Sequence, residues 1–144
     1  MPIAYVDVRF CVHATEDLDK VIDAVQNVLP SDHIEDVTFK RSNLEGHYGN
    51  PITFFDTRIK NKDIVRALVE NISANLSALD KEELDRTINR CVEKGSLFIR
   101  LDKQVALKGN IKFATSDPIR IRIRFRKNKT ENVIQICREI GMMT

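Results

Sequence analysis

Apolar and polar residues alternate along several segments of this chain, the pattern of a β-strand with one buried face. Residues 3–14 and 118–126 show the alternation most regularly. Weaker alternation predicts four further strands, over residues 33–41, 51–60, 96–102 and 104–114. In the last of these, Gly109-Asn110 is expected to form a tight turn.

Four other segments repeat apolar residues at helical spacing. The first is expected to begin after Thr15 as its N-cap and to end before Pro30, and the second covers about residues 62–77. Asp80 and Glu83 have the spacing of a capping box that opens a third helix, and Gly95 is placed to end it. A short helix over residues 130–140 follows the last strand.

This order of elements predicts an α+β fold in which a mostly antiparallel sheet packs its helices on one face and leaves the other face largely open to water. The chain has 144 residues, no low-complexity tract and no linker, so we expect a single domain over residues 1–144. Which residues occupy the open face then becomes the main question about function.

The most regular strand carries arginine at every second position. Its apolar residues are expected to enter the core, and its arginines to form a row on the open face: Arg120, Arg122, Arg124 and Arg126. Guanidinium groups keep their charge and donate in a planar fork that suits phosphate oxygens. The row therefore indicates a polyanion-binding surface, although a solvated face that blocks unwanted strand pairing would also be charged.

Charge is distributed unevenly along the chain. The whole protein carries a net charge of +2, but residues 118–144 hold seven Lys and Arg against two acidic residues, a net of +5. This asymmetry favours a local binding face over a generally basic protein. On the same face we expect Arg58, Arg100 and the ring of Phe98, because RNA-binding sheets combine cations for phosphates with aromatic rings for bases.

Two loops contain residues that could add contacts. In the stretch Glu45 to Pro51, His47 and Tyr48 could meet a base or a phosphate, or the stretch could be a structural turn. At the end of the 96–102 strand, Lys103 could bind phosphate and Gln104 a base edge or ribose hydroxyl, although an ion pair at a strand end explains the same residues.

Several classes of function are disfavoured. No phosphate-binding glycine loop, nucleophile motif or metal-ligand spacing occurs, so we expect no enzyme activity, cofactor or metal. No apolar run is long enough for a membrane helix, and the N-terminus does not resemble a secretion signal. The three cysteines are odd in number and widely spaced, as in a reducing compartment, and we expect a cytoplasmic protein.

Three stretches together resemble an archaeal family described as predicted RNA-binding or exosome-associated subunits. They are residues 13–17, residues 45–52, and residues 101–104 followed by Gly109. The resemblance covers about residues 4–126. It implies an α+β fold similar to the ribosomal large-subunit protein that binds 5S RNA, and a role in RNA binding or processing, without established catalytic residues.

We therefore expect a non-catalytic RNA-binding protein, accessory to RNA processing or degradation, that meets duplex or single-stranded RNA and other subunits of an RNA-processing complex but no membrane. Two alternatives stay open. One is a protein-interaction subunit whose arginine strand docks an acidic partner. The other is a small enzyme for a phosphorylated substrate, with Glu45, His47 and Lys103 in its site.

Overall fold

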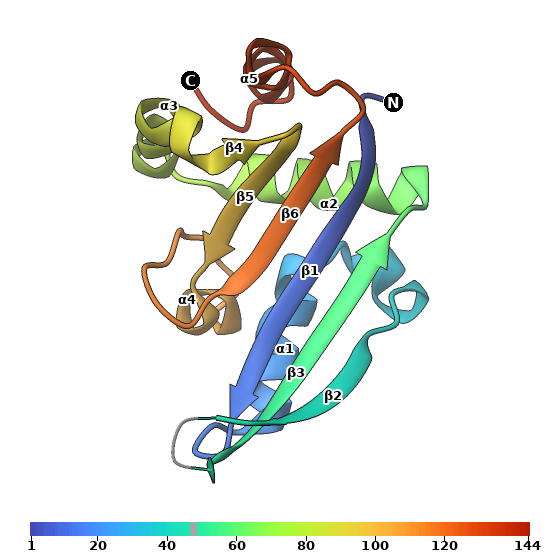
Figure 1. Cartoon of the computed structure of the whole chain (residues 1–144), viewed down its shortest axis with the longest axis vertical. Coiled ribbons are helices and arrows are strands. Elements are labelled where there is room, and N and C mark those ends of the chain that lie inside the picture. The colour runs from blue at the N-terminus through green and yellow to red at the C-terminus, as the bar shows by residue number, and fades with distance from the viewer. Residues whose placement is uncertain (47–48) are drawn as a thin grey trace.

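The computed structural model describes residues 1–46 and 49–144 and has an α+β fold (Figure 1). Six strands form one sheet in the order β2-β3-β1-β6-β5-β4, and all neighbouring pairs are antiparallel. The strands are β1 (Ile3–His13), β2 (Lys40–Glu45), β3 (Pro51–Ile59), β4 (Val92–Glu93), β5 (Ser96–Leu101) and β6 (Ile119–Phe125).

The helices lie to one side of this sheet. They are α1 (Leu18–Val28), α2 (Lys62–Asn75), α3 (Ala78–Cys91), α4 (Lys103–Leu107) and α5 (Thr130–Glu139), with a 3₁₀ helix η1 (Ser31–Asp36) after α1. In Figure 1, α1 and α2 lie behind the sheet and α5 lies at the end where both chain termini are found. The predicted arrangement of an antiparallel sheet with helices on one face is confirmed.

The core forms between the helices and the inward residues of the central strands. Val6 and Val8 of β1 are fully buried, as are the four apolar residues of β6: Ile119, Ile121, Ile123 and Phe125. On β3 it is Phe55 that enters the core, where its ring stacks on Phe10 at 4.8 Å between centroids. Because successive residues face opposite ways, Phe54 lies on the open side, where it is half-buried.

Two predicted strands are wrong. Residues 33–41 do not form one strand: Ser31–Asp36 is a 3₁₀ helix, and β2 begins only at Lys40. Residues 104–114 are not a strand either, because Asp102 caps α4 by accepting a hydrogen bond from Val105 N at 2.9 Å. Such local side-chain-to-backbone bonds override an apparent alternation over a few residues.

Several helix boundaries also differ from the prediction. The N-cap of α1 is Asp17 rather than Thr15, and the N-cap of α3 is Ser77, three residues before Asp80. Gly95 does not end α3 but occupies the turn between β4 and β5 with a φ of +80°. A glycine is needed there because a Cβ atom would lie 2.9 Å from the carbonyl oxygen of Lys127.

Candidate nucleic-acid interface

The four arginines of the β6 segment lie on the side of the sheet opposite the core. Their apolar neighbours are all buried, while Arg120 and Arg126 are exposed and Arg122 and Arg124 are half-buried. The predicted facing of this strand is therefore confirmed. The side chains differ, however, in what they contact, and this decides which of them are free to meet a ligand.

Arg120 lies in the middle of a row of three arginines on neighbouring strands. The register places Arg9 of β1 directly opposite it on one side and Arg100 of β5 on the other. Residues directly opposite in antiparallel strands have Cβ atoms about 4.5–5.5 Å apart, and like charges at this spacing destabilise the sheet. Arg9 is compensated by Asp56, whose Oδ1 accepts from Arg9 Nε at 3.1 Å. Within residues 1–46 and 49–144, Arg100 and Arg120 have no such partner.

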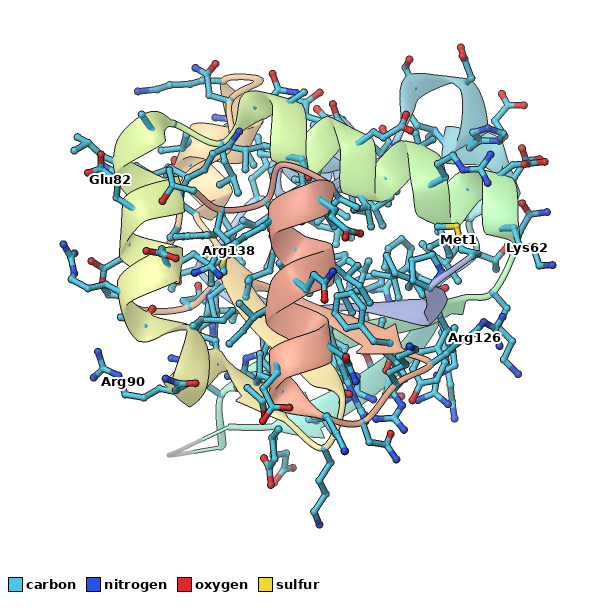
Figure 2. The ribbon with its side chains drawn as sticks, turned by 90° about the horizontal axis from the view of Figure 1, so that it is seen from above. Met1, Lys62, Glu82, Arg90, Arg126 and Arg138 are labelled. Atoms are coloured by element: carbon cyan, nitrogen blue, oxygen red, sulfur yellow. The ribbon has the colours of Figure 1, made fainter. Side chains whose placement is uncertain are left out.

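A shallow depression of about 380 Å³ surrounds this row. Arg90 reaches it from the last turn of α3, which Figure 2 shows beside the sheet, and Arg122 and the ring of Phe98 complete its rim. We call the five arginines of this depression the arginine patch: Arg9, Arg90, Arg100, Arg120 and Arg122. Among the residues that the structure describes, two carboxylates, Asp7 and Glu93, line the same depression against five arginines, so its local charge is positive.

Asp7 lies beneath one end of the patch and holds Arg58 in place. Its side chain is 2% exposed, and its two oxygens accept from Arg58 Nε at 2.8 Å and from Arg58 Nη2 at 3.1 Å. This hydrogen bond raises the pKa of Arg58 above its ordinary value. Arg58 also lies over the ring of Tyr5, at 4.0 Å from the centroid. Asp7 therefore engages two of the five N–H donors of Arg58.

Arg122 is shared between the protein and the open face. Its Nε donates to Ser96 Oγ at 3.0 Å, and one Nη lies 4.0 Å from Asp7 Oδ2. Its guanidinium group lies 5.5 Å from the centre of the Phe98 ring, within the range of a cation–π interaction. Phe98 itself is 44% exposed, an unusual position for a large apolar ring.

Arg124 and Arg126 donate hydrogen bonds to neighbouring segments of this protein. Arg124 donates to the carbonyl oxygen of Lys94 and to Asn128 Oδ1, and Arg126 Nε donates to the carbonyl oxygen of Met1 at 3.0 Å. Arg124 thereby ties the turn after β4 to the segment before α5. The arginine row of β6 is thus not a uniform series of free cations, because two of its four members close loops.

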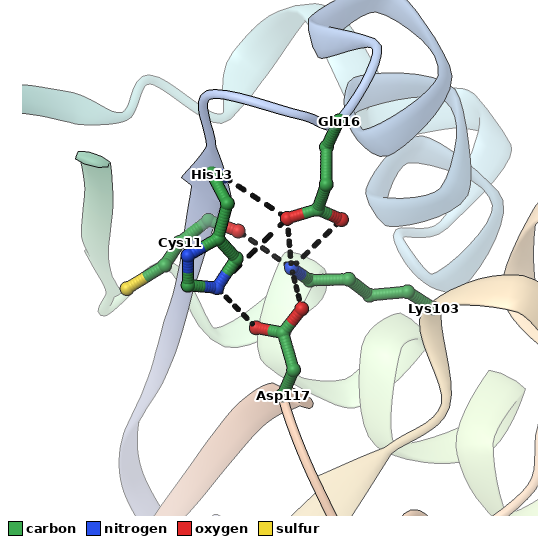
Figure 3. Close-up of polar contacts among 5 residues, drawn as sticks. All are labelled: Cys11, His13, Glu16, Lys103 and Asp117. Carbon is green, nitrogen blue, oxygen red and sulfur yellow. Dashed lines mark hydrogen bonds and ion pairs between the residues drawn. The ribbon is translucent and has the colours of Figure 1, made fainter. Parts of the chain in front are cut away.

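Lys103 lies in a polar cluster where the end of β1 meets the start of α4 and the segment before β6 (Figure 3). Its side chain is only 6% exposed, and its Nζ donates to the Cys11 carbonyl oxygen at 2.6 Å. The same Nζ lies 3.2 Å from Glu16 Oε1 and 3.0 Å from Asp117 Oδ2. These internal acceptors account for the three protons of Lys103, and a phosphate contact of Lys103 stays a prediction.

His13 completes the cluster. Its Nε2 lies 3.1 Å from Asp117 Oδ1, and burial alone would raise the pKa of Asp117. The hydrogen bonds from Lys103 and His13 outweigh burial, so the pKa of Asp117 lies below its ordinary value. His13, Glu16 and Asp117 each place one ligand-type atom within 4.8 Å of the others. The ammonium group of Lys103 lies between the two carboxylates and donates to both, so these residues form an ion-pair network.

The remaining candidate residues lie away from the patch or outside the described residues. Gln104 is exposed beside α1, where it lines a hollow with Thr15 and Lys20. His47 and Tyr48 lie outside the described residues. On either side of them, Gly46 N donates to the Asn50 carbonyl oxygen at 2.7 Å, a contact that closes the hairpin between β2 and β3.

Comparison with known proteins decides the family. A family model described as RNA binding matches residues 5–125, which is most of the chain. The chain belongs to this RNA-binding family. It is similar to "RNA-binding protein PAB1135" of Pyrococcus abyssi, with 34% identity over 137 residues that cover 92% of this chain and 89% of the relative.

Two solved archaeal structures have the same fold as this chain. Mth689, a DUF54 protein from Methanothermobacter thermautotrophicus, is 32% identical, with a TM-score of 0.78 over 96% of this chain and 97% of that chain. AF2318, a DUF54 family protein of Archaeoglobus fulgidus, is 29% identical, with a TM-score of 0.81 over 96% and 99% of the two chains. In the described residues of the present chain, no helix is long and apolar enough to cross a membrane.

Two residues were missed at the level of sequence, Arg90 of the arginine patch and Asp117 of the Lys103 cluster. Arg90 follows the polar face of a helix, and nothing in its surroundings along the chain indicates that it meets the sheet. Asp117 contacts Lys103, which also contacts Glu16. These contacts bring together residues 13–17 and 101–104, two stretches of the family resemblance that lie about 90 residues apart in the sequence. Long-range contacts of this kind carry no local sequence signal.

Proposed function

We propose that this protein binds RNA through the arginine patch on the open face of its sheet, without catalysing a reaction. The family and the relative named as an RNA-binding protein support RNA binding. The proposal also includes an accessory role in RNA processing or degradation and contact with other subunits of an RNA-processing complex, both of which come from the family resemblance. The arginine patch supports only the RNA contact in this proposal.

The observation that carries the proposal is the row Arg9–Arg120–Arg100. Three like charges opposite one another on adjacent strands cost stability, and a face that only needed to be soluble would avoid this cost by alternating signs. A phosphate backbone removes the repulsion, because each phosphate accepts from one or two guanidinium groups. Arg9 has a carboxylate partner, but Arg100 and Arg120 have none within the described residues, so the row is better explained by an anionic ligand than by a solvated surface.

The patch also predicts how strongly binding depends on salt. Arg90, Arg100 and Arg120 are unpaired within the described residues, and Arg9 and Arg122 are each shared with a carboxylate. If three to five of these arginines contact a phosphate, log affinity should change with log salt with a slope of about −2 to −3.5 for single-stranded RNA. Arg58, Arg124 and Arg126 lie at the margin of this surface.

Fluorescence anisotropy of labelled RNA tests the proposal, with wild type compared with Arg100→Glu/Arg120→Glu. Loss of two phosphate contacts at about 0.1 M salt weakens binding at least about 25-fold, and charge reversal adds repulsion to this loss. Both side chains are exposed, so the variant is expected to fold, which circular dichroism checks.

Lys62→Glu/Arg66→Glu on α2 is the matched control, because it makes the same change in net charge on exposed positions of the helical side (Figure 2 labels Lys62). It is expected to bind RNA within about threefold of wild type at moderate salt, since distant exposed charges are largely screened. Equal weakening by the two double variants would show that only overall charge matters and would contradict the proposed surface.

A further inference from the structure

Beside the arginine patch, a second hollow of about 300 Å³ lies between α3 and β5. Its walls are mainly apolar and come from Leu84, Cys91, Ile99, Phe113 and Ala114, with Thr87 as a polar member. Arg90, Phe98, Ile99 and Arg100 line both this hollow and the patch, so the two are continuous. A volume of about 300 Å³ is at the lower end of the range for small-molecule sites.

We propose that this hollow accepts one unstacked base of a single-stranded RNA while the arginines at its rim hold the neighbouring phosphates. This inference rests on the proposed function and goes further, because it names the form of RNA that the protein selects. Charge complementarity and continuity with the patch support a nucleotide as the occupant: an apolar hollow bordered by two guanidinium groups fits a flat ring attached to an anionic backbone.

Phe98 is the residue that joins the two parts. It projects from β5 on the open face, opposite Arg122 in the register, and 44% of it is exposed at the shared rim. A base entering the hollow from a backbone on the patch passes this ring, and stacking on an aromatic ring is the usual way in which proteins hold unpaired bases. Burying the exposed ring under a base also removes apolar surface from water.

The polar groups of the hollow are few. Thr87 Oγ1 donates to the Glu83 carbonyl oxygen at 2.8 Å and lies 3.7 Å from Cys91 Sγ, which leaves one lone pair of the hydroxyl to accept from a base amino group. Arg90 and Arg100 can donate to base oxygens or ring nitrogens at the rim. Such a small set favours binding of an unpaired base without strong preference for its sequence.

A fully paired helix cannot use this site. In duplex RNA the bases are stacked on their neighbours, and proteins contact mainly the backbone and the 2′-hydroxyls. Duplex RNA would therefore meet only the arginines, and single-stranded RNA would meet the arginines and the hollow together.

Anisotropy titrations with single-stranded RNA and with blunt duplex RNA of equal length test this inference. The proteins are wild type, Phe98→Ala, the pocket-filling variant Thr87→Phe, and Arg100→Glu/Arg120→Glu. We expect wild type to prefer the single strand, and Phe98→Ala to weaken single-strand binding about 5- to 100-fold while duplex binding stays within about twofold. Thr87→Phe, which changes no charge, is expected to act in the same selective way.

The outcomes separate this inference from the proposed function. If Phe98→Ala and Thr87→Phe affect neither RNA, or both RNAs equally, while the arginine variant loses both, the base site is refuted and the arginine surface stands. If wild type binds no RNA at low salt, both ideas fail together. If one of the two variants is unfolded by circular dichroism, the other alone decides, because the two residues come from different elements.

Discussion

Replacing Lys103 by methionine separates two explanations of this lysine, an internal ion pair and a phosphate contact. The substitution keeps an unbranched apolar stem in a site that is 6% exposed and removes only the charge and its three donors. The carbonyl oxygen of Cys11 loses its 2.6 Å partner, and the carboxylates of Glu16 and Asp117 lose the cation between them.

The expected loss follows from the exposure of those partners. Removing one member of a fully buried ion pair costs about 3–5 kcal/mol. Here the two carboxylates are 21% and 45% exposed and can recover water, so we expect the free energy of unfolding to fall by about 2–3 kcal/mol. For a domain of this size, a loss of that magnitude lowers the melting temperature by about 6–10 °C.

Urea denaturation and thermal melts measure this change, with Lys108→Met as control. Lys108 is exposed just after α4, so its replacement is expected to change the free energy of unfolding by less than about 0.5 kcal/mol. The double variant Lys103→Met/Glu16→Gln should be less destabilised than the sum of its single changes, since each removes the same contact.

Measuring the RNA affinity of Lys103→Met could refute the ion-pair assignment of Lys103. Because Lys103 lies outside the arginine patch, Lys103→Met measured where it is folded should bind RNA within about twofold of wild type. Unchanged stability combined with a clear loss of RNA affinity would show that the lysine contacts phosphate and that the ion-pair assignment is wrong.

Two further substitutions and one labelling experiment have definite expected outcomes. Gly95→Ala forces a Cβ against the Lys127 carbonyl oxygen at a φ of +80° and should cost about 1–3 kcal/mol in urea denaturation, where an unchanged midpoint would contradict the geometry. The folded-state pKa of Asp117 lies below its ordinary value of 3.8, so its contribution to stability is present above that value and is lost as pH falls through the folded-state pKa. Asp117→Asn should therefore be less stable than wild type at pH 7, with a difference that shrinks in acid; a constant difference would argue against the link to ionisation. Burial raises the pKa of Cys137 to about 12, so this thiol should react with a thiol reagent only after unfolding, and fast reaction in the native protein, followed by peptide mapping, would contradict its burial.

The sheet and its facing could be predicted because a period of two is a direct signal of a half-buried strand. The alternation of β6 placed Ile121 in the core and Arg120 outside, and both placements are confirmed. The strand predicted over 33–41 failed because Pro30 and the polar residues after it favour a local 3₁₀ turn, which is stronger than a few alternating apolar residues. The helix α4 was missed since Asp102 looks like a strand end until its capping bond is seen.

The chemistry of individual side chains was less predictable, because it depends on partners far away in the sequence. Arg58 and Asp7 are 51 residues apart, and Lys103 and Glu16 are 87 apart. Arg58 and Lys103 were predicted to contact RNA, which stays a prediction, and each has an internal carboxylate partner that the sequence did not indicate. Arg90 entered the candidate site only through the position of α3 beside the sheet.

The most direct test of the arginine patch is the salt dependence of RNA affinity in wild type and in Arg100→Met/Arg120→Met. Each lost phosphate contact reduces the slope of log affinity against log salt by about 0.7 for single-stranded RNA, so we expect the double variant to have a slope shallower by about 1.4. Lys62→Met/Arg66→Met should keep the slope of wild type. A slope that stays unchanged in Arg100→Met/Arg120→Met would show that RNA does not meet this face of the sheet.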